Sequence, residues 1–331
     1  MLNTHFLYLL GHLRLIEEQH CVISLNPAGI GLIGTASYNQ LYTHAVKQST
    51  HHCQLKSVCN IAPSQPSIAY FSQEKQKIEQ LMDDEEIDSI IVTEICSDAL
   101  LKYTVNAAIA AGKNVLLNNI PNYSNEEFEK LLKLATKNDV LIDYNQPLYF
   151  DEQFAKVKAT LQDEHRLDTG LLRLSAHRII EAENRLPLNT VWATLAQKVE
   201  LLTTLLPDIA FSALSIQYSH PLKQMEDGDV LIINFKHKCG LLVSLELFFN
   251  TGSVLDKLTL KQCNNRYEIE NKSYVNQLNQ YIDEDNVVFK QLDQFILKLR
   301  SNTKLIPAIH WERTNRLTHD LLEQLRHSGF I

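Results

Sequence analysis

Short apolar runs alternate with longer amphipathic stretches over the first half of the chain. The apolar runs have the length of buried strands and lie at 28–33, 55–62, 87–95, 115–117 and 140–144. Apolar residues at helical spacing fill the stretches between them, and Gly112 and Ser124 mark the end of one helix and the start of the next. This alternation predicts a parallel, doubly wound α/β sheet of the Rossmann type, which binds ligands outside the carboxyl ends of its strands.

After about residue 150 the apolar positions alternate with a period of two. The runs read LLRLSAH, ALSIQYSH, DVLIINFKH, GLLVSLELFF and KLTLKQC, and polar breaks of the hairpin type separate several of them. They predict a mostly antiparallel open sheet, with helices at 151–162, 191–206, near 284–300 and near 314–327. We therefore expect an N-terminal extension at 1–27, a Rossmann domain at 28–150 and a C-terminal α+β domain at 151–331.

The composition is that of an ordinary globular protein. Hydrophobic residues make up 45% and charged residues 21% of the 331 positions, and the formal net charge is -8. Because there is no long basic run, we expect no binding to nucleic acid. The apolar segment from His5 to Ile16 is too short to span a bilayer and predicts an amphipathic helix, so we also expect no membrane partner.

Cysteines and histidines do not indicate a metal site. The six cysteines form no C-x-x-C pair, and the thirteen histidines are scattered along the chain. Free thiols are typical of a protein in the reducing cytoplasm, which is the compartment we expect. The sequence also contains no H-x-x-x-H, G-x-S-x-G or P-loop motif, so a metalloenzyme or a hydrolase is disfavoured.

Three local motifs resemble those of one family. Ile87-Asp88 leads into a strand, AAIAAGKNVLL follows at 107–117, and a proline then precedes Ser-x-Glu-Glu at 124–127. These motifs resemble the glucose–fructose oxidoreductase and inositol dehydrogenase (Gfo/Idh/MocA) family, clearly over 28–150 and weakly over 151–331. The resemblance implies a first domain that binds NAD(P), and a second domain that binds a small-molecule substrate and forms homodimers through its open sheet.

The family's glycine-rich G-x-G-x-x-G turn corresponds to residues 34–39, which read Gly-Thr-Ala-Ser-Tyr-Asn. The resemblance implies that this turn contacts the cofactor through Gly34, Thr35, Ala36, Tyr38 and Asn39. Only the first glycine is kept, and Ala36 adds a methyl group where the pyrophosphate would come close. The motif therefore predicts weakened dinucleotide binding. The alternative is that the segment is simply the turn between a strand and a helix.

Two further positions bear on the cofactor. Asn60 stands where the family has an acid that holds the ribose hydroxyls, so a 2′-phosphate is no longer repelled. Ser64 and Ser67 could donate hydrogen bonds to that phosphate, which favours NADP over NAD; the alternative is a solvated turn. Glu94 stands where the family has a threonine–proline pair, and there it would place a charge beside the nicotinamide pocket, unless it is a partner of a helix dipole or a solvated loop acid.

The groups that handle protons in the family are replaced. The family's E-K-P motif corresponds to residues 118–120, so an amide, Asn119, stands in place of the lysine. The D-x-x-x-H cluster of the second domain corresponds to Ala193 and Gln197, and a later family acid to Glu200. Three losses at separate places indicate either altered chemistry or none.

Reduction of an imine is the reaction that needs these groups least, because an imine nitrogen is basic and often protonated, so the imine carbon accepts hydride without a strong enzymic acid. The chain is similar to the thiazolinyl imine reductases of siderophore assembly, a branch of the family, in Tyr42, in two extra residues near Cys96 and in a short link before residue 191. That branch keeps a histidine at the position of Asn119. Tyr144 and His177 are candidate catalytic replacements, although residues of this kind more often have a structural role.

Two hypotheses therefore stand. The first is an NAD(P)H-dependent reductase of an imine-type substrate, with Asn119, Tyr144 and His177 as catalytic candidates and NADP as the favoured cofactor. The second is a non-catalytic family member that binds a ligand or pairs with an active homologue. The apolar run at 241–249 could supply a dimer face on the open sheet, or it could be core packed against helices.

Overall fold

The structure is a computed structural model of the whole chain. It describes residues 27–49, 53–62, 68–95, 97–144, 149, 152–162, 170–178, 187–206, 209, 214–219, 229–238, 240–249, 254–262, 265–273, 287–300 and 306–330. The expected N-terminal helix, Ser64, Ser67 and Cys96 lie outside the described residues.

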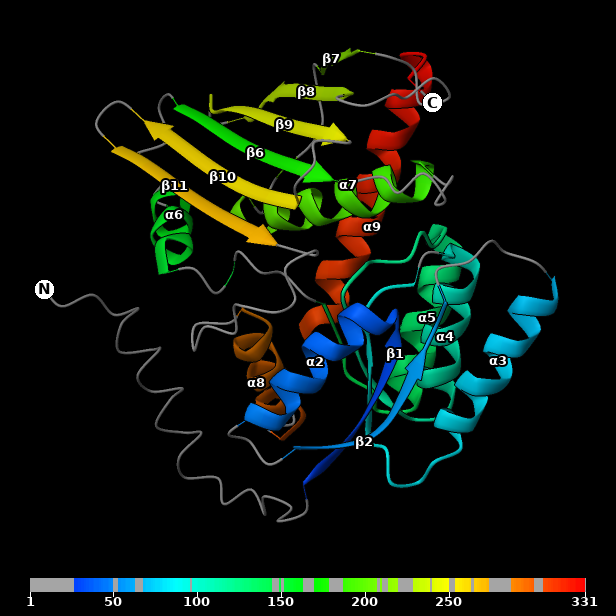
Figure 1. Cartoon of the computed structure of the whole chain (residues 1–331). Coiled ribbons are helices and arrows are strands. Elements are labelled where there is room, and N and C mark those ends of the chain that lie inside the picture. Colours follow the sequence, from blue (N-terminus) through cyan, green and yellow to red (C-terminus); the bar gives the residue numbers. More distant parts are fainter. Residues whose placement is uncertain are drawn as a thin grey trace, which may run out of the picture.

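The first sheet has five parallel strands in the order β2-β1-β3-β4-β5. Its strands are β1 (Ala28–Gly34), β2 (Cys53–Asn60), β3 (Ser89–Val92), β4 (Asn114–Leu117) and β5 (Ile142–Tyr144), and the helices that follow the first four are α2 (Ala36–Gln48), α3 (Ile68–Met82), α4 (Asp98–Ala110) and α5 (Asn125–Lys137). The predicted parallel α/β arrangement is confirmed. All carboxyl ends meet at the edge that faces the second domain (Figure 1).

Local signals set the ends of these helices. Gly112 follows α4 with a φ of 73°, in the left-handed region that glycine adopts without strain. Ser124 caps α5, and its side chain and that of Glu127 form a reciprocal capping box. The lysine of the AGK segment, Lys113, donates to the carbonyl oxygens of Asp84 (2.8 Å) and Ile87 (2.7 Å), so it fixes the entry into β3. The two helix ends expected from the sequence are confirmed.

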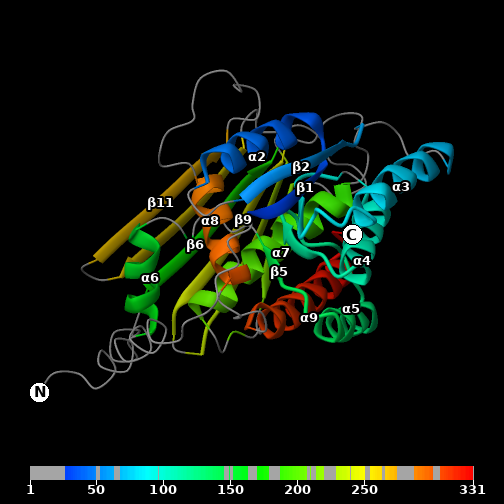
Figure 2. The ribbon, with the colours of Figure 1, turned by 90° about the horizontal axis from the view of Figure 1, so that it is seen from below.

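Helices cover both faces of the first sheet. The helices α3, α4 and α5 lie on one face, and α2 lies on the other together with α8 (Val287–Arg300) (Figures 1 and 2). Phe295 of α8 packs in one cluster with Ile30 and Leu32 of β1. In addition, Lys298 forms an ion pair with Asp143 (2.6 Å). The chain thus returns to the first domain after it has built the second sheet.

The second sheet has six strands in the order β11-β10-β6-β9-β8-β7, and only β6 and β9 pair in parallel. The strands are β6 (Gly170–Arg178), β7 (Ser215–Tyr218), β8 (Val230–Lys236), β9 (Leu242–Phe249), β10 (Val254–Gln262) and β11 (Asn265–Ser273). The predicted mostly antiparallel sheet is confirmed. The sequence did not reveal β11, because Ile269 is its one buried residue among those with described side chains, and charged residues flank it.

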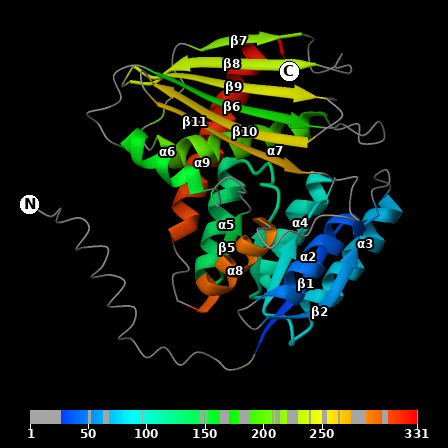
Figure 3. The same ribbon diagram turned by 60° about the vertical axis from the view of Figure 1, so that its left-hand side comes forward.

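Three helices lie between the second sheet and the first domain: α6 (Glu152–Gln162), α7 (Pro187–Leu205) and α9 (Ile306–His327) (Figure 3). The strand β9 turns Val243, Leu245 and Leu247 inward, and each is almost completely buried. On the other face, Glu246 pairs with Arg173 of β6 (2.8 Å). Most of the apolar run at 241–249 is therefore core packed against helices, whereas Leu242 is 54% exposed.

The described residues contain neither a membrane-spanning helix nor a cluster of metal ligands. Within the described ranges, no helix has the length and hydropathy to cross a membrane. The same part of the chain contains no group of three or more His, Cys, Asp or Glu side chains that could hold a metal ion.

Replacing Phe295 by alanine should lower the free energy of unfolding by about 3–5 kcal/mol, because the aromatic ring is fully buried between α8 and the first sheet. Chemical denaturation measures the change. The matched control is Leu297→Ala on the same helix, where the side chain is 40% exposed. Equal losses in the two variants would contradict the packing of α8 on this sheet.

Candidate active site

The turn after β1 requires glycine at its first position. A Cβ atom on Gly34 would lie 2.0 Å from Oγ1 of Thr93 and 2.7 Å from the backbone nitrogen of Glu94. Its φ of 154° also lies in a range that other residues rarely adopt. The close approach of β1 to the loop after β3 therefore explains why this glycine stands here.

Asn39 holds three loops together at the carboxyl edge. Its amide nitrogen donates to the carbonyl oxygens of Gly34 (3.0 Å) and Cys59 (3.1 Å) and to Oδ1 of Asn60 (2.9 Å). Its own oxygen accepts from the hydroxyl of Thr93 (2.8 Å). Because Asn39 is 1% exposed and its polar atoms are engaged, it supports the site and does not offer a ligand contact. The structure thus assigns a structural role to this expected cofactor residue.

The helix α2 starts at the carboxyl edge with its positive end exposed. Its N-cap residue, Thr35, makes no side-chain cap, and the first turn contains no acidic residue. Ala36 is exposed at the first helical position, and Tyr38 is half-buried two residues later. A helix start of this kind is suited to an anion such as a pyrophosphate.

Glu94, from the loop after β3, lies against this helix start. Its carbonyl oxygen accepts from the backbone N–H of Thr35 (3.0 Å), and its carboxylate accepts from the hydroxyl of Thr35 (3.2 Å). The nearby Asn60 is exposed at the end of β2, and its oxygen is occupied by Asn39. The amide nitrogen of Asn60 is therefore the part of that side chain that can reach a ligand.

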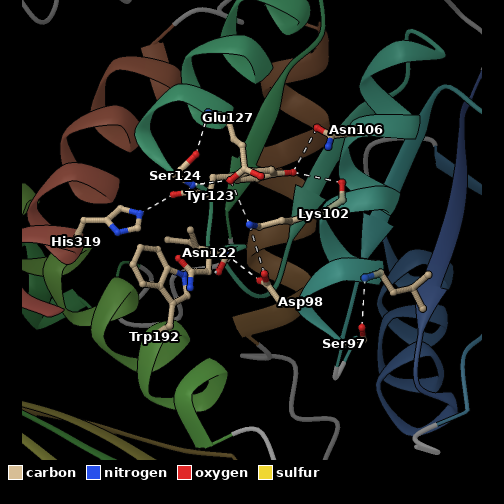
Figure 4. Close-up of polar contacts among 12 residues, drawn as sticks. Ser97, Asp98, Lys102, Asn106, Asn122, Tyr123, Ser124, Glu127, Trp192 and His319 are labelled. Carbon is tan, nitrogen blue, oxygen red and sulfur yellow. Dashed lines mark hydrogen bonds and ion pairs between the residues drawn. The ribbon is translucent and has the colours of Figure 1, made fainter. Parts of the chain in front are cut away.

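The segment after β4 is fixed by the surrounding helices (Figure 4). The indole N–H of Trp192 from α7 donates to the carbonyl oxygen of Ile120 (3.2 Å), and Nε2 of His319 from α9 donates to that of Tyr123 (2.6 Å). The carboxylate of Asp98 from α4 accepts from the backbone N–H of Asn122 (3.0 Å). The half-buried Asn119 lies in this segment, so the structure supports an amide rigidly at the position that the resemblance assigns to a lysine.

Two tyrosines connect the first domain to α7. Tyr149 donates to the carboxylate of Glu200 and lies 2.7 Å from the hydroxyl of Thr204. Tyr144, at the end of β5, is 7% exposed, and its hydroxyl contacts the Gln197 side chain without reaching normal hydrogen-bond geometry. Burial, followed by the charge of Glu200, raises the pKa of Tyr144 well above its ordinary value. The Tyr144 hydroxyl therefore keeps its proton at neutral pH.

A buried charge network joins α7 to the second sheet behind these tyrosines. Arg178 of β6 donates to Oε1 of Gln197 (2.8 Å) and to Oδ1 of Asp256 (2.8 Å), and Lys198 forms an ion pair with the same carboxylate. The Lys198 side chain is 1% exposed, and burial lowers its pKa. Burial opposes ionisation of Asp256, but the charges of Lys198 and Arg178 prevail and lower its pKa to about 2.

The sequence analysis missed this network, although two signals were present. Arg178 shares the buried face of β6 with Leu172 and Leu174, where a charged residue is exceptional. Lys198 likewise stands among buried positions of α7. The period-two pattern of β6 places Arg178 on the side that faces the core. The helical pattern of α7 does the same for Lys198.

His177 does not join the tyrosines. It lies on the opposite face of β6 from Arg178, and its ring stacks on Phe248 with centroids 4.6 Å apart. Burial in this contact lowers its pKa. The structure therefore gathers Asn119, Tyr144 and the Gly34 turn at the edge facing the second domain and leaves His177 on the outer face of the second sheet.

Several known proteins are similar to this chain over part or most of its length. Residues 29–145 match the family model described as the NAD-binding domain of homoserine dehydrogenase. Among solved structures, myo-inositol 2-dehydrogenase from Lactobacillus plantarum is similar with a TM-score of 0.67 and 11% identity, covering 92% of this chain and 98% of that one. This chain has the fold of the Gfo/Idh/MocA family. The predicted resemblance of the first domain to an NAD-binding Rossmann domain is confirmed over residues 29–145.

Other structures with this Gfo/Idh/MocA fold were solved with a cofactor. GenD2 of gentamicin A biosynthesis, in complex with NAD, gives a TM-score of 0.63 at 12% identity and covers 89% of this chain and 93% of its own. Biliverdin reductase from Synechocystis, in complex with biliverdin and NADP+, gives 0.59 at 15% identity and covers 90% and 99%. No curated protein matches the sequence at a significant level. Both structures share the fold of this chain, one with NAD and one with NADP+, and they leave the choice between the two cofactors open.

Replacing Asp256 by asparagine should destabilise the protein by about 3–5 kcal/mol at neutral pH, because Arg178 and Lys198 would remain buried without their counter-charge. The pKa of Asp256 is lowered on folding, so its ionised form stabilises the protein above its ordinary value of 3.8. That contribution is lost as the pH falls from about 4 to 2. Denaturation of both proteins across this range should show the difference shrinking.

The matched control is Glu268→Gln. Glu268 also pairs with two cations, Lys257 and Arg266, but on the open outer face of the second sheet. Solvent screens this group, so the variant should unfold almost as the natural protein does. A loss in Glu268→Gln as large as in Asp256→Asn would refute the special position of the buried network.

Proposed function

We propose that the chain is an NAD(P)H-dependent reductase of an imine-type substrate and that Tyr144 is its proton donor. The observation that supports this most is the buried Tyr144 hydroxyl at the end of β5 and beside α7, whose contact with Gln197 falls short of normal hydrogen-bond geometry. Buried polar groups almost always have well-placed partners, so a poorly satisfied hydroxyl at the ligand-binding edge of a Rossmann sheet is suited to contact a ligand.

The cofactor fits the residues present, with one exception. The Gly34 turn and the uncapped start of α2 suit a pyrophosphate, and the Asn60 amide suits a 2′-phosphate better than a carboxylate would. The exception is the carboxylate of Glu94 beside Thr35. NADP is the cofactor we propose, and a bound nicotinamide would supply hydride. The Synechocystis biliverdin reductase, which shares the fold, was solved with NADP+.

The residues around the edge favour imine reduction over alcohol oxidation. Alcohol oxidation requires a base for the hydroxyl proton, and Asn119, Ala193 and Gln197 cannot serve as one. When hydride adds to the imine carbon, the nitrogen must take up one proton to become an amine. Tyr144 holds its proton at neutral pH. The nitrogen that has received the electron pair is far more basic than a phenolate, so Tyr144 can transfer its proton to it and then regain one from solvent. A cyclic imine, as in peptide-metallophore assembly, is the substrate class that we propose.

A second candidate is a non-catalytic family member. The amide at Asn119 and the carboxylate of Glu94 at the start of α2 favour it, because the first removes a proton-handling group and the second opposes an anionic cofactor. Such a protein would bind a ligand or pair with an active homologue. Dimerisation through the outer face of the second sheet is part of both proposals, and light scattering tests it.

Addition of NADPH should raise the unfolding temperature more than addition of NADH. A ligand at 100 times its dissociation constant stabilises the folded state by about 2.7 kcal/mol, so a thermal scan detects a functional site. Oxidation of NADPH in the presence of a cyclic imine should accompany the shift. Stabilisation without turnover would favour the non-catalytic candidate, and no stabilisation by either nucleotide would exclude the reductase.

Replacing Tyr144 by phenylalanine should lower turnover of the imine roughly hundredfold while the protein stays folded, because only the proton donor is removed. Single-turnover kinetics with saturating NADPH measures the change. The control is Tyr103→Phe in α4, whose hydroxyl bonds to Glu79 on the protein surface. Unchanged turnover in Tyr144→Phe would refute Tyr144 as the donor.

Replacing Asn60 by aspartate should reverse the preference between cofactors. A carboxylate at the end of β2 would accept from ribose hydroxyls and repel a 2′-phosphate, so the ratio of NADPH to NADH affinity should fall roughly tenfold or more. Fluorescence titration of both nucleotides gives the ratio. If the ratio stays constant, the ribose does not lie beside Asn60.

A further inference from the structure

The start of α2 already contains a negative charge from elsewhere in the chain. The helix supplies none itself, because Thr35 makes no side-chain cap and the first turn has no acid. The carboxylate of Glu94 comes from the loop after β3 and lies 3.2 Å from the hydroxyl of Thr35. It therefore interacts favourably with the positive end of the helix, which is what a bound phosphate would do.

The backbone of Glu94 is fixed beside the start of α2. The carbonyl oxygen of Glu94 accepts from the N–H of Thr35 (3.0 Å), and the preceding residue, Thr93, bonds through its backbone N–H to the carbonyl oxygen of Ile33 (2.8 Å). Gly34 packs against the same loop so closely that a methyl group there would collide with it. The loop after β3 is thus fixed against the turn after β1, and the carboxylate stays near the helix start.

We infer that Glu94 sets the affinity of the site for ligands that carry a pyrophosphate. This inference rests on the proposed function for the place where a dinucleotide binds. The Glu94 carboxylate repels the phosphates across a few ångströms and competes with them for the same helix start. Ligands that lack phosphate do not meet this repulsion. Glu94 is accordingly a specificity-determining residue that acts on the charge of the ligand.

The test is the substitution Glu94→Gln, which keeps an oxygen for the Thr35 hydroxyl and removes the charge. Calorimetric titration with NADPH and with ADP should show roughly tenfold tighter binding to the variant than to the natural protein. Adenosine, titrated as an uncharged probe, should bind both proteins equally. The advantage of the variant should shrink at high salt, because ions screen the repulsion between exposed charges.

The matched control is Glu86→Gln, which makes the same change in net charge. Glu86 is 73% exposed and precedes β3, at the opposite edge of the sheet from the helix start. Its removal should leave the affinity for NADPH and ADP unchanged. An equal gain in both variants would show that only the net charge of the protein matters, and this would overturn the inference.

The remaining outcomes separate the inference from the proposed function. If the natural protein and Glu94→Gln bind NADPH equally well, the inference fails and the reductase proposal stands. If only Glu94→Gln binds NADPH, the inference holds and the natural protein is not a reductase. If neither binds NADPH or ADP, both fail. A gain for adenosine as large as that for ADP would also overturn the inference.

Discussion

The carboxylate of Asp256 allows two cations to be buried between α7 and the second sheet, and the geometry of the site depends on that arrangement. Without it, Lys198 and Arg178 could not remain in the core, because an unpaired buried charge is too costly. Arg178 in turn holds the Gln197 amide. The same helix presents Glu200 to Tyr149 and Trp192 to the segment after β4. A single buried anion therefore fixes the helix that faces the ligand-binding edge.

The segment after β4 is held rigidly at the ligand-binding edge, and it carries an amide where the resemblance implies a lysine. Trp192, His319 and Asp98 still fix the segment that contains Asn119. Rigid support of an amide is useful for orienting a ligand, but an amide cannot exchange a proton near neutral pH. A reaction at this edge must therefore either supply its own basic atom, as an imine does, or take its proton from Tyr144.

The sequence predicted the parallel sheet well because buried parallel strands are apolar throughout and glycine or serine marks the helix ends. It failed where a side chain's partner is distant in the chain. Nothing near Glu94 indicates that its carboxylate meets Thr35, 59 positions away. The expected candidate His177 lies on the outer face for a simpler reason: successive residues of β6 point to opposite faces, and the face toward α7 carries Arg178.

Glu94 and Tyr144 act on the two reactants in opposite ways. A carboxylate beside the start of α2 weakens the binding of an anionic cofactor, whereas a protonated phenol at the end of β5 favours a substrate that accepts a hydrogen bond. Both residues lie at the same edge of one sheet. In the proposed site, a change at either residue would therefore affect the binding of both the cofactor and the substrate. A chain under pressure to hold a dinucleotide tightly would lose the carboxylate, since an amide keeps the bond to Thr35. In the proposed site, therefore, the start of α2 attracts the phosphates of the cofactor and Glu94 opposes that attraction.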